Sequence, residues 1–207
     1  MPSSRPSTRP PRGSRVLVLG IDPGLHRTGV AVVDGRAGAL TLLHAECLEI
    51  AAGDSDADRL ARLFGLLEAV MVVHHPEVAS VEKLFFATNR TSAIRVSEAR
   101  GVALCAIARA GVPVIEYTPM QVKESVAGWG GAEKPQLAKM TMALLDIDHI
   151  DGPDDVADAC AIAVCHHHRA PLHSQGRRPP TSRSGATPAL AAAVDAARSR
   201  MRAGDAE

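Results

Sequence analysis

The sequence predicts an α/β fold in which helices flank a central five-stranded mixed sheet. Three short apolar segments follow one another near the N-terminus, separated only by Gly and Asp turns, which is typical of an antiparallel meander. Two later strands alternate with helices, and this order gives a mixed sheet covered by helices. With 207 residues, the chain is long enough for one domain with a proper core.

The first five elements follow from local pattern. Strands are expected over residues 15–22, 28–34 and 39–50, where β-branched residues are frequent or apolar and polar residues alternate. A helix is expected over residues 56–74, because apolar side chains recur there at helical spacing. The chain then returns as a fourth strand over residues 77–83.

The second half of the domain is richer in helices. The expected elements are a helix over residues 90–111, a strand over 112–118, and helices over about 134–145 and 155–168. Thr118 is followed by Pro119 and, at the third helical position, by Gln121. This arrangement predicts a capping box and therefore a further helix start.

Charge divides the chain into a body and two ends. Residues 1–14 and 169–207 are rich in Arg, Pro, Ser or Ala and are predicted to be disordered extensions of a domain over residues 15–168. The whole chain has no net charge, but residues 16–168 hold only 12 basic against 20 acidic residues. The basic ends either reach toward a polyanion or are solvated tails.

Cysteine usage and hydropathy predict a cytoplasmic protein. The cysteines lie in apolar settings without a tight spacing pattern, so reduced thiols are expected, at Cys47, Cys105, Cys160 and Cys165. The basic N-terminus lacks the apolar stretch of a signal peptide, and no apolar run has the length of a membrane span.

Four acids stand where a carboxylate needs an explanation. Asp22 ends the first strand and Glu82 ends the fourth, both beside apolar neighbours. Asp155 and Asp158 are three residues apart, which places them on one face of a helix. Each also has a purely structural interpretation: a strand end can face solvent, and acids in a first turn complement the helix dipole.

Taken together, the four acids suggest a metal site. The first and fourth strands can be neighbours at the centre of such a sheet, with the last helix beside them. Four carboxylates in one cleft repel one another and stay partly protonated unless divalent cations are bound. Mg²⁺ prefers hard oxygen ligands, and a pair of such ions is a common device for phosphodiester hydrolysis.

Several segments also carry a family resemblance. They are "LGIDPGLHRTGVAVVD", "VEKLFFATNRTSAIRVSEARGVAL", "VIEYTPMQVKESVAGWGGAEKPQLAKM" and "DDVADACAIAVCHHH". Together they resemble the RuvC family of Holliday junction resolvases over about residues 15–168. The resemblance implies a ribonuclease H-like fold and a homodimeric endonuclease that cuts four-way DNA junctions by paired symmetric nicks in recombination and repair.

The resemblance also assigns an active site and partners. The acids that match the family's catalytic and metal-binding cluster are Asp22, Glu82, Asp155 and Asp158. Asp154 has no counterpart and is interpreted as a helix cap. Two Mg²⁺ ions per site are implied, with Mn²⁺ as a substitute, and the products would be 5′-phosphate and 3′-hydroxyl ends. A branch-migration helicase complex of RuvA and RuvB is the implied protein partner.

DNA contacts are expected from two kinds of side chain. By resemblance, Phe85 matches a base-stacking position, although it and its neighbour Phe86 can equally be core residues. Lys123 and Lys134 match positions that contact the DNA backbone, and such contacts give affinity without sequence information. Arg90 and Arg95 are further candidates for this role. The small and apolar residues of the 90–111 helix suit both core packing and a dimer interface.

Other classes of protein share part of this pattern. A ribonuclease H-like nuclease for ribosomal RNA precursors shares the first motif but is normally shorter. An actin-like ATPase or sugar kinase has a similar first phosphate loop, but such proteins usually need a second loop and more than 300 residues. A junction-binding module without activity would have lost an acid. The "CHHH" segment at 165–168 suggests zinc, but its spacing fits no closed zinc site.

Overall fold

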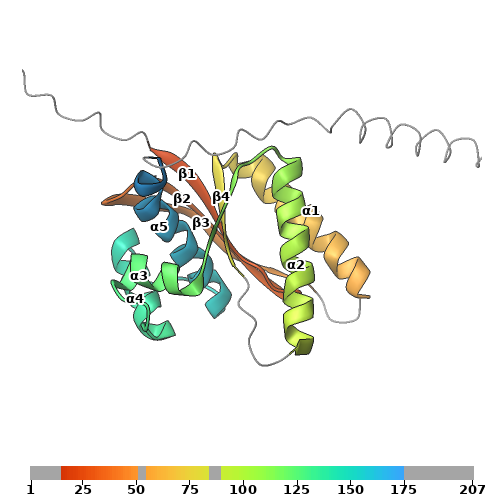
Figure 1. Ribbon diagram of the computed structural model, residues 1–207. Helices are drawn as coiled ribbons and strands as arrows, with labels where there is room; N and C mark the ends of the chain where they lie inside the picture. The colour runs from red at the N-terminus through yellow and green to blue at the C-terminus, as the bar shows by residue number, and fades with distance from the viewer. Residues whose placement is uncertain (1–14, 51–54, 84–89, 175–207) are drawn as a thin grey trace, which may run out of the picture. The chain divides into compact units, whose positions relative to one another are not determined.

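A five-stranded mixed sheet with strand order β3-β2-β1-β4-β5 forms the centre of the computed structural model (Figure 1). The structure describes residues 15–50, 55–83 and 90–174. The strands are β1 (Val16–Asp22), β2 (Arg27–Arg36), β3 (Ala39–Glu49), β4 (Val78–Glu82) and β5 (Val114–Tyr117). β1 pairs antiparallel with β2 and parallel with β4. The expected mixed sheet, with the first and fourth strands adjacent, is therefore confirmed.

Helices cover both faces of this sheet (Figure 1). They are α1 (Asp56–His74), α2 (Arg90–Arg109), α3 (Pro119–Ala127), α4 (Lys134–Leu145) and α5 (Asp154–Ser174). One buried cluster joins α1 and α2 to the sheet, and a second joins α3, α4 and α5 to the opposite face. The central strands are consequently buried on both sides, which explains their continuous apolar sequences.

The alternation of side chains along a strand decides on which face of the sheet each side chain of β1 lies. Leu19 and Ile21 belong to the cluster with α1 and α2, whereas Val18 belongs to the cluster with α5. Side chains two residues apart lie on the same face, so Gly20 and Asp22 face α5. In β4, the hydroxyl of Ser80 donates to the α5 carbonyl of Ile162 over 3.3 Å. The strand-end acids on β1 and β4 thus share the α5 side of the sheet.

Helix boundaries agree with the sequence except at the C-terminal end. The predicted capping box is present: Thr118 accepts from the Gln121 amide, and Gln121 accepts from the Thr118 amide. α5 begins at Asp154 and continues to Ser174, so the expected end at 168 lies inside the helix. Pro171 is a local signal for an earlier end, because proline lacks the amide that a helix interior needs, yet the helix continues through it.

Close contact between β1 and α5 depends on Gly20. A Cβ atom added there would overlap the backbone oxygen of Ala159 and crowd Ala163. We expect Gly20→Ala to lower the free energy of unfolding by about 1–3 kcal/mol, the usual cost of overpacking a core. Gly65→Ala in α1 is the control, because a Cβ there meets no atom within 4 Å. It should stabilise the helix by about 0.5–1 kcal/mol.

Urea unfolding monitored by circular dichroism measures both variants. Equal midpoints for Gly20→Ala and the unmodified chain would show that α5 does not pack on β1 as closely as described.

Candidate active site

Asp22 and Glu82 occupy the carboxyl ends of two adjacent parallel strands. Ile21 pairs with Val81 in the register of β1 and β4, so the two acids follow side by side. The turn after Asp22 is closed by Thr28, whose buried hydroxyl donates to the Gly24 carbonyl over 2.7 Å. Asp22 is therefore held between a buried strand and a fixed turn.

The first turn of α5 lies over this sheet edge because β2 lacks a side chain there. A Cβ atom at Gly29 would overlap the backbone carbonyl of Asp155. Gly29 is also the partner of Asp22 in the β1–β2 register. The absence of a side chain at Gly29 thus allows Asp155 and Asp158 to approach the strand acids.

Asp22 interacts electrostatically with each of the other three acids, and Glu82 also interacts with Asp158. Burial raises the pKa of Asp22 to about 8, and repulsion from Asp158, Glu82 and Asp155 adds to the rise. Burial and then Asp158 raise the pKa of Glu82 to about 7. Because an ionised carboxylate disfavours the ionisation of its neighbours, the cluster cannot be fully ionised at neutral pH without added positive charge.

Two basic side chains supply part of that charge. The Lys134 ammonium from α4 donates to Asp158 Oδ2 over 2.9 Å, and this hydrogen bond raises the pKa of Lys134. Arg27 Nε, at the start of β2, lies 3.2 Å from Asp155 Oδ2. The second pair has the distance of an ion pair but not the alignment of a hydrogen bond, so Asp155 Oδ2 is buried without a hydrogen-bond partner.

Sequence reasoning missed Arg27. The available signal is its place in "DPGLHRTG", directly after the turn that follows Asp22 and two residues before Gly29. A basic side chain at the start of a strand is usually solvated, so this spacing alone does not indicate a contact with α5.

The donor set fits a hard divalent cation. The cluster offers carboxylate oxygens alone, including Asp155 Oδ2, which accepts no hydrogen bond. Within the described ranges no three His, Cys, Asp or Glu side chains already converge as metal ligands. Lys134 and Arg27 take up oxygens of Asp158 and Asp155 instead. To bind a metal ion, Asp155 and Asp158 would therefore have to release the basic side chains that now contact them.

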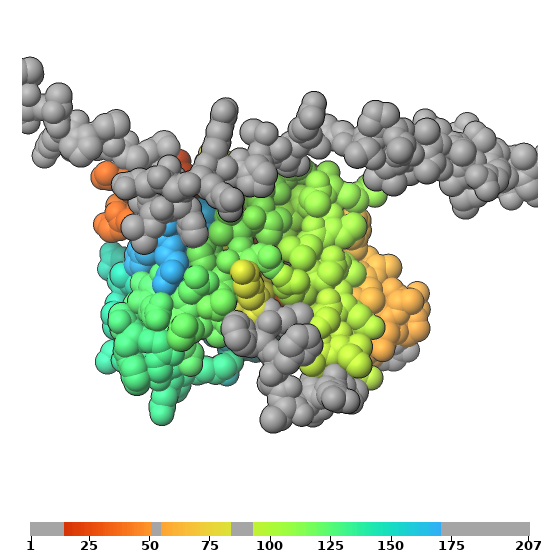
Figure 2. Space-filling view, in the orientation of Figure 1, coloured from red at the N-terminus to blue at the C-terminus, as the bar shows by residue number. Residues whose placement is uncertain are grey.

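The predicted DNA contacts fall into two groups. Lys123 on α3 is half-buried and its charge lowers the pKa of Glu82, so it lies near the acids together with Lys134. Arg95 is exposed on α2. Phe85 lies outside the described residues, and Arg90 is described only as the first residue of α2. Figure 2 shows the end of β4 reaching the surface between α2 and the α3–α4 segment.

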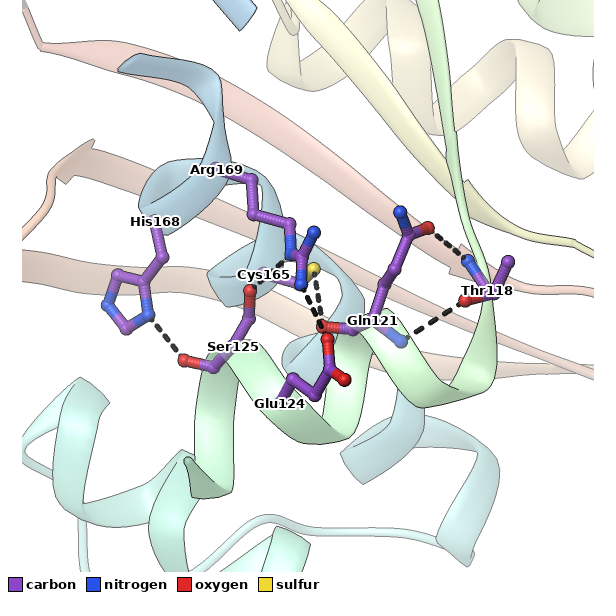
Figure 3. Close-up of polar contacts among 7 residues, drawn as sticks. All are labelled: Thr118, Gln121, Glu124, Ser125, Cys165, His168 and Arg169. Carbon is purple, nitrogen blue, oxygen red and sulfur yellow. Dashed lines mark hydrogen bonds and ion pairs between the residues drawn. The ribbon is translucent and has the colours of Figure 1, made fainter. Parts of the chain in front are cut away.

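The orientation of α3, which carries Lys123, is fixed by polar contacts to α5 (Figure 3). Arg169 Nε donates to Ser125 Oγ over 2.8 Å, and its Nη2 lies 3.0 Å from Glu124 Oε2. His168 Nδ1 contacts the Ser125 carbonyl at 2.9 Å. The long α5 therefore positions α3 as well as the two aspartates.

These contacts also explain the "CHHH" segment without zinc. His166 Nδ1 lies 3.0 Å from the Tyr117 hydroxyl, and His167 Nε2 lies 3.1 Å from the Val33 carbonyl. The sulfur of Cys165 lies 3.7 Å from the Gln121 carbonyl. The four side chains contact three different elements, so the segment connects α5 to β2, β5 and α3.

The described cysteines are all free thiols, as the sequence predicts. No helix in the part of the chain that the structure describes has the length and apolar character to cross a lipid bilayer.

Acids at the ends of β1 and β4 and on α5, around a mixed sheet in this order, define the ribonuclease H-like class of nucleases. The family model for crossover junction endodeoxyribonuclease RuvC matches residues 18–166. The chain belongs to the RuvC family.

Individual relatives agree with this assignment. The chain is 45% identical over 156 residues to a crossover junction endodeoxyribonuclease RuvC from Moorella thermoacetica, covering 75% of this chain and 93% of the relative. It resembles T. thermophilus RuvC, solved in complex with a Holliday junction substrate, with a TM-score of 0.73, 36% identity, and coverage of 77% and 97% of the two chains. The yeast mitochondrial Holliday junction resolvase Ydc2, at 15% identity, TM-score 0.58, and coverage of 77% and 81%, shares the fold.

The raised pKa of Asp22 predicts a stability change with pH when divalent cations are removed. Between pH 4 and 8 the folded chain keeps a proton on Asp22 that the unfolded chain releases, so stability falls as pH rises through this range. In EDTA, Asp22→Asn should raise the melting temperature, with a gain that grows from pH 5 to pH 8. At pH 8 we expect the melting temperature to rise by roughly 4 °C or more. This rise corresponds to about 1–2 kcal/mol, since a domain of this size shifts about 2–4 °C per kcal/mol.

Thermal unfolding followed by circular dichroism measures this gain. Asp148→Asn, which changes an exposed acid, is the control and should leave the melting temperature unchanged. A gain for Asp22→Asn that does not vary with pH would contradict the burial of this acid among like charges.

Proposed function

We propose that this chain is a structure-selective endonuclease that resolves four-way DNA junctions by paired symmetric nicks, in recombination and DNA repair. The observation that carries the proposal is the cluster of mutually repelling acids at the ends of β1 and β4 and on α5, in a chain of the RuvC family. The relative from T. thermophilus was solved with a Holliday junction substrate. Family membership favours this activity over ribosomal RNA processing and over an actin-like ATPase.

The four acids act together as a binding site for divalent metal ions. We assign the ligand role to Asp22, Glu82, Asp155 and Asp158, with two Mg²⁺ ions as the expected occupants and Mn²⁺ as a substitute. When bound, such ions lower the pKa of a water molecule and stabilise the leaving 3′ oxygen. The chain itself contributes the carboxylate oxygens and holds them beside the scissile phosphate. Hydrolysis then gives 5′-phosphate and 3′-hydroxyl ends.

Lys123 and Lys134 hold the DNA backbone beside the acids. Both act electrostatically on the acid cluster, so a phosphate that approaches the cluster also approaches them. Their ammonium groups offset the repulsion between the DNA and the carboxylates. Phe85, Arg90 and Arg95 remain predicted contacts, with Phe85 stacking on an unpaired base at the junction centre.

Two copies of the chain act on one junction. Residues Ala99, Ala103 and Ala106 of α2 are buried in the core, which accounts for one side of this helix. The exposed side of α2 carries Ile94, Gly101 and Cys105 at helical spacing, with the exposed Glu98 on the same face. The small and apolar residues of this face suit close helix packing across a two-fold axis. A dimer would present two active sites to opposite strands.

The remaining expectations concern context. Residues 15–168 are the proposed nuclease domain, and residues 1–14 and 169–207 are the proposed extensions. The last helix of the domain, α5, continues past residue 168 to Ser174. Free thiols and a DNA substrate suit a cytoplasmic enzyme. A helicase complex of RuvA and RuvB is the proposed partner, on the resemblance alone.

Cleavage of a synthetic mobile four-way junction, end-labelled on each strand, tests the proposed function. With Mg²⁺ we expect nicks at symmetry-related positions in opposing strands, and none in EDTA or in a linear duplex of the same sequence. Asp22→Asn should lower the cleavage rate at least about 100-fold, since even changes outside the metal ligands cost 10–100-fold. Equal cutting of linear DNA would indicate a general nuclease, and binding without cutting an inactive module.

Salt dependence of junction binding tests the role of Lys123. Lys123→Gln should weaken binding alike for junctions of different sequence and reduce the slope of log K against log salt concentration by about 1, the value for one lost phosphate contact. Lys139→Gln, at an exposed position on α4, is the matched control. Fluorescence anisotropy at several NaCl concentrations in EDTA gives both slopes. Identical slopes for the two variants would show that Lys123 makes no phosphate contact.

A further inference from the structure

Each aspartate of α5 is paired with a basic residue from another element. Asp158 accepts from Lys134 at the start of α4, and Asp155 lies 3.2 Å from Arg27 at the start of β2. The Arg27 side chain is 53% exposed, whereas Asp155 is 27% exposed. The Arg27 side chain therefore reaches the acid cluster and still has about half of its surface exposed to solvent.

The Arg27–Asp155 pair is held weakly. The contact lacks the alignment of a hydrogen bond and leaves Asp155 Oδ2 without a hydrogen-bond partner. Ion pairs with one partner exposed typically contribute little stability. Glu49 lies directly opposite Arg27 in the β2–β3 register, so a second carboxylate is carried on the same face of the sheet next to Arg27. Little free energy is needed to move Arg27 from Asp155 to another anion.

A DNA phosphate is such an anion. Guanidinium groups bind phosphate oxygens with two parallel hydrogen bonds, a geometry that Arg27 does not attain with Asp155. A metal ion at the cluster, in turn, would bind the same Asp155 oxygen that Arg27 contacts. DNA and metal ion thus favour the same displacement of one side chain.

We propose that Arg27 is a positioning residue that neutralises Asp155 until a DNA phosphate draws the guanidinium away, so that DNA binding frees Asp155 for a divalent cation. This inference rests on the proposed function. It makes DNA and metal binding mutually reinforcing, since a ligand that increases the affinity for a second ligand is itself bound more tightly by the same factor. The acid cluster would then be loaded with metal chiefly where substrate is present.

Calorimetric titration of Ca²⁺ into the full chain tests the proposal, with and without a four-way junction. Ca²⁺ binds the same carboxylate oxygens, and gel analysis after each titration verifies that the junction is uncut. For the free chain, Arg27→Gln should tighten Ca²⁺ binding about threefold, the effect of removing one weak competing ion pair. For the junction complex, the same substitution should leave Ca²⁺ affinity nearly unchanged.

Three control variants separate this role from a general effect of charge. Arg36→Gln removes the same charge from the exposed far end of β2 and should change neither titration. Arg27→Lys retains the charge and should therefore keep most of the wild-type difference in Ca²⁺ affinity between the free chain and the junction complex. In an Asp155→Asn background, Arg27→Gln should no longer alter Ca²⁺ affinity, because the group that it competes for is absent. Far-ultraviolet circular dichroism verifies that each variant is folded.

The outcomes distinguish the proposal from its alternatives. Equal tightening in the free chain and in the complex would overturn it, because Arg27 would then act as a fixed background charge. No change in the free chain would also overturn it, because the ion pair would not compete with metal. If the wild-type chain fails to bind the junction, the proposed function fails and this inference fails with it. The titration of the free chain, which needs no DNA, then shows whether Arg27 competes with metal at all.

Discussion

The partial burial of four carboxylates in one cluster, together with their mutual repulsion, is the constraint on which the rest of this structure depends. Burial alone disfavours an ionised Asp22, and its three acidic neighbours raise its pKa further. When ionised, such a cluster costs folding free energy, so at neutral pH it either keeps a proton or needs positive charge from other groups. Lys134 and Arg27 do so in the described structure, and a divalent cation would do so more completely.

Backbone packing brings the acids together, and glycine makes that packing possible. Gly20 lets α5 approach β1, and Gly29 lets the start of α5 approach β2. The polar network between α3 and α5 then fixes Lys123 relative to the same helix. One helix therefore positions two of the acids directly and one of the compensating lysines through its neighbour.

Much of the fold could be predicted because its signals are local. Apolar strands with short turns between β1, β2 and β3 indicate a meander, and Thr118 with Gln121 marks the start of α3 within four residues. Asp22 and Glu82 stand out because acids rarely follow such apolar runs. The continuation of α5 past residue 168 could not be predicted. Pro171 favours an earlier end, and the contacts of His168 and Arg169 to α3 are distant in sequence.

The sequence by itself determined the order of the elements, the family and the four candidate acids, because each depends on residue type and spacing along the chain. Only the tertiary structure decided that Asp155 meets Arg27 and that Asp158 meets Lys134. These pairs join residues far apart in sequence, and their geometry follows from how closely α5 packs on Gly20 and Gly29. The "CHHH" histidines show the same limit: their spacing suggested a metal, whereas packing gave each ring a different hydrogen-bond partner. Charge and spacing name the candidates for a site, but only packing decides which of them come into contact.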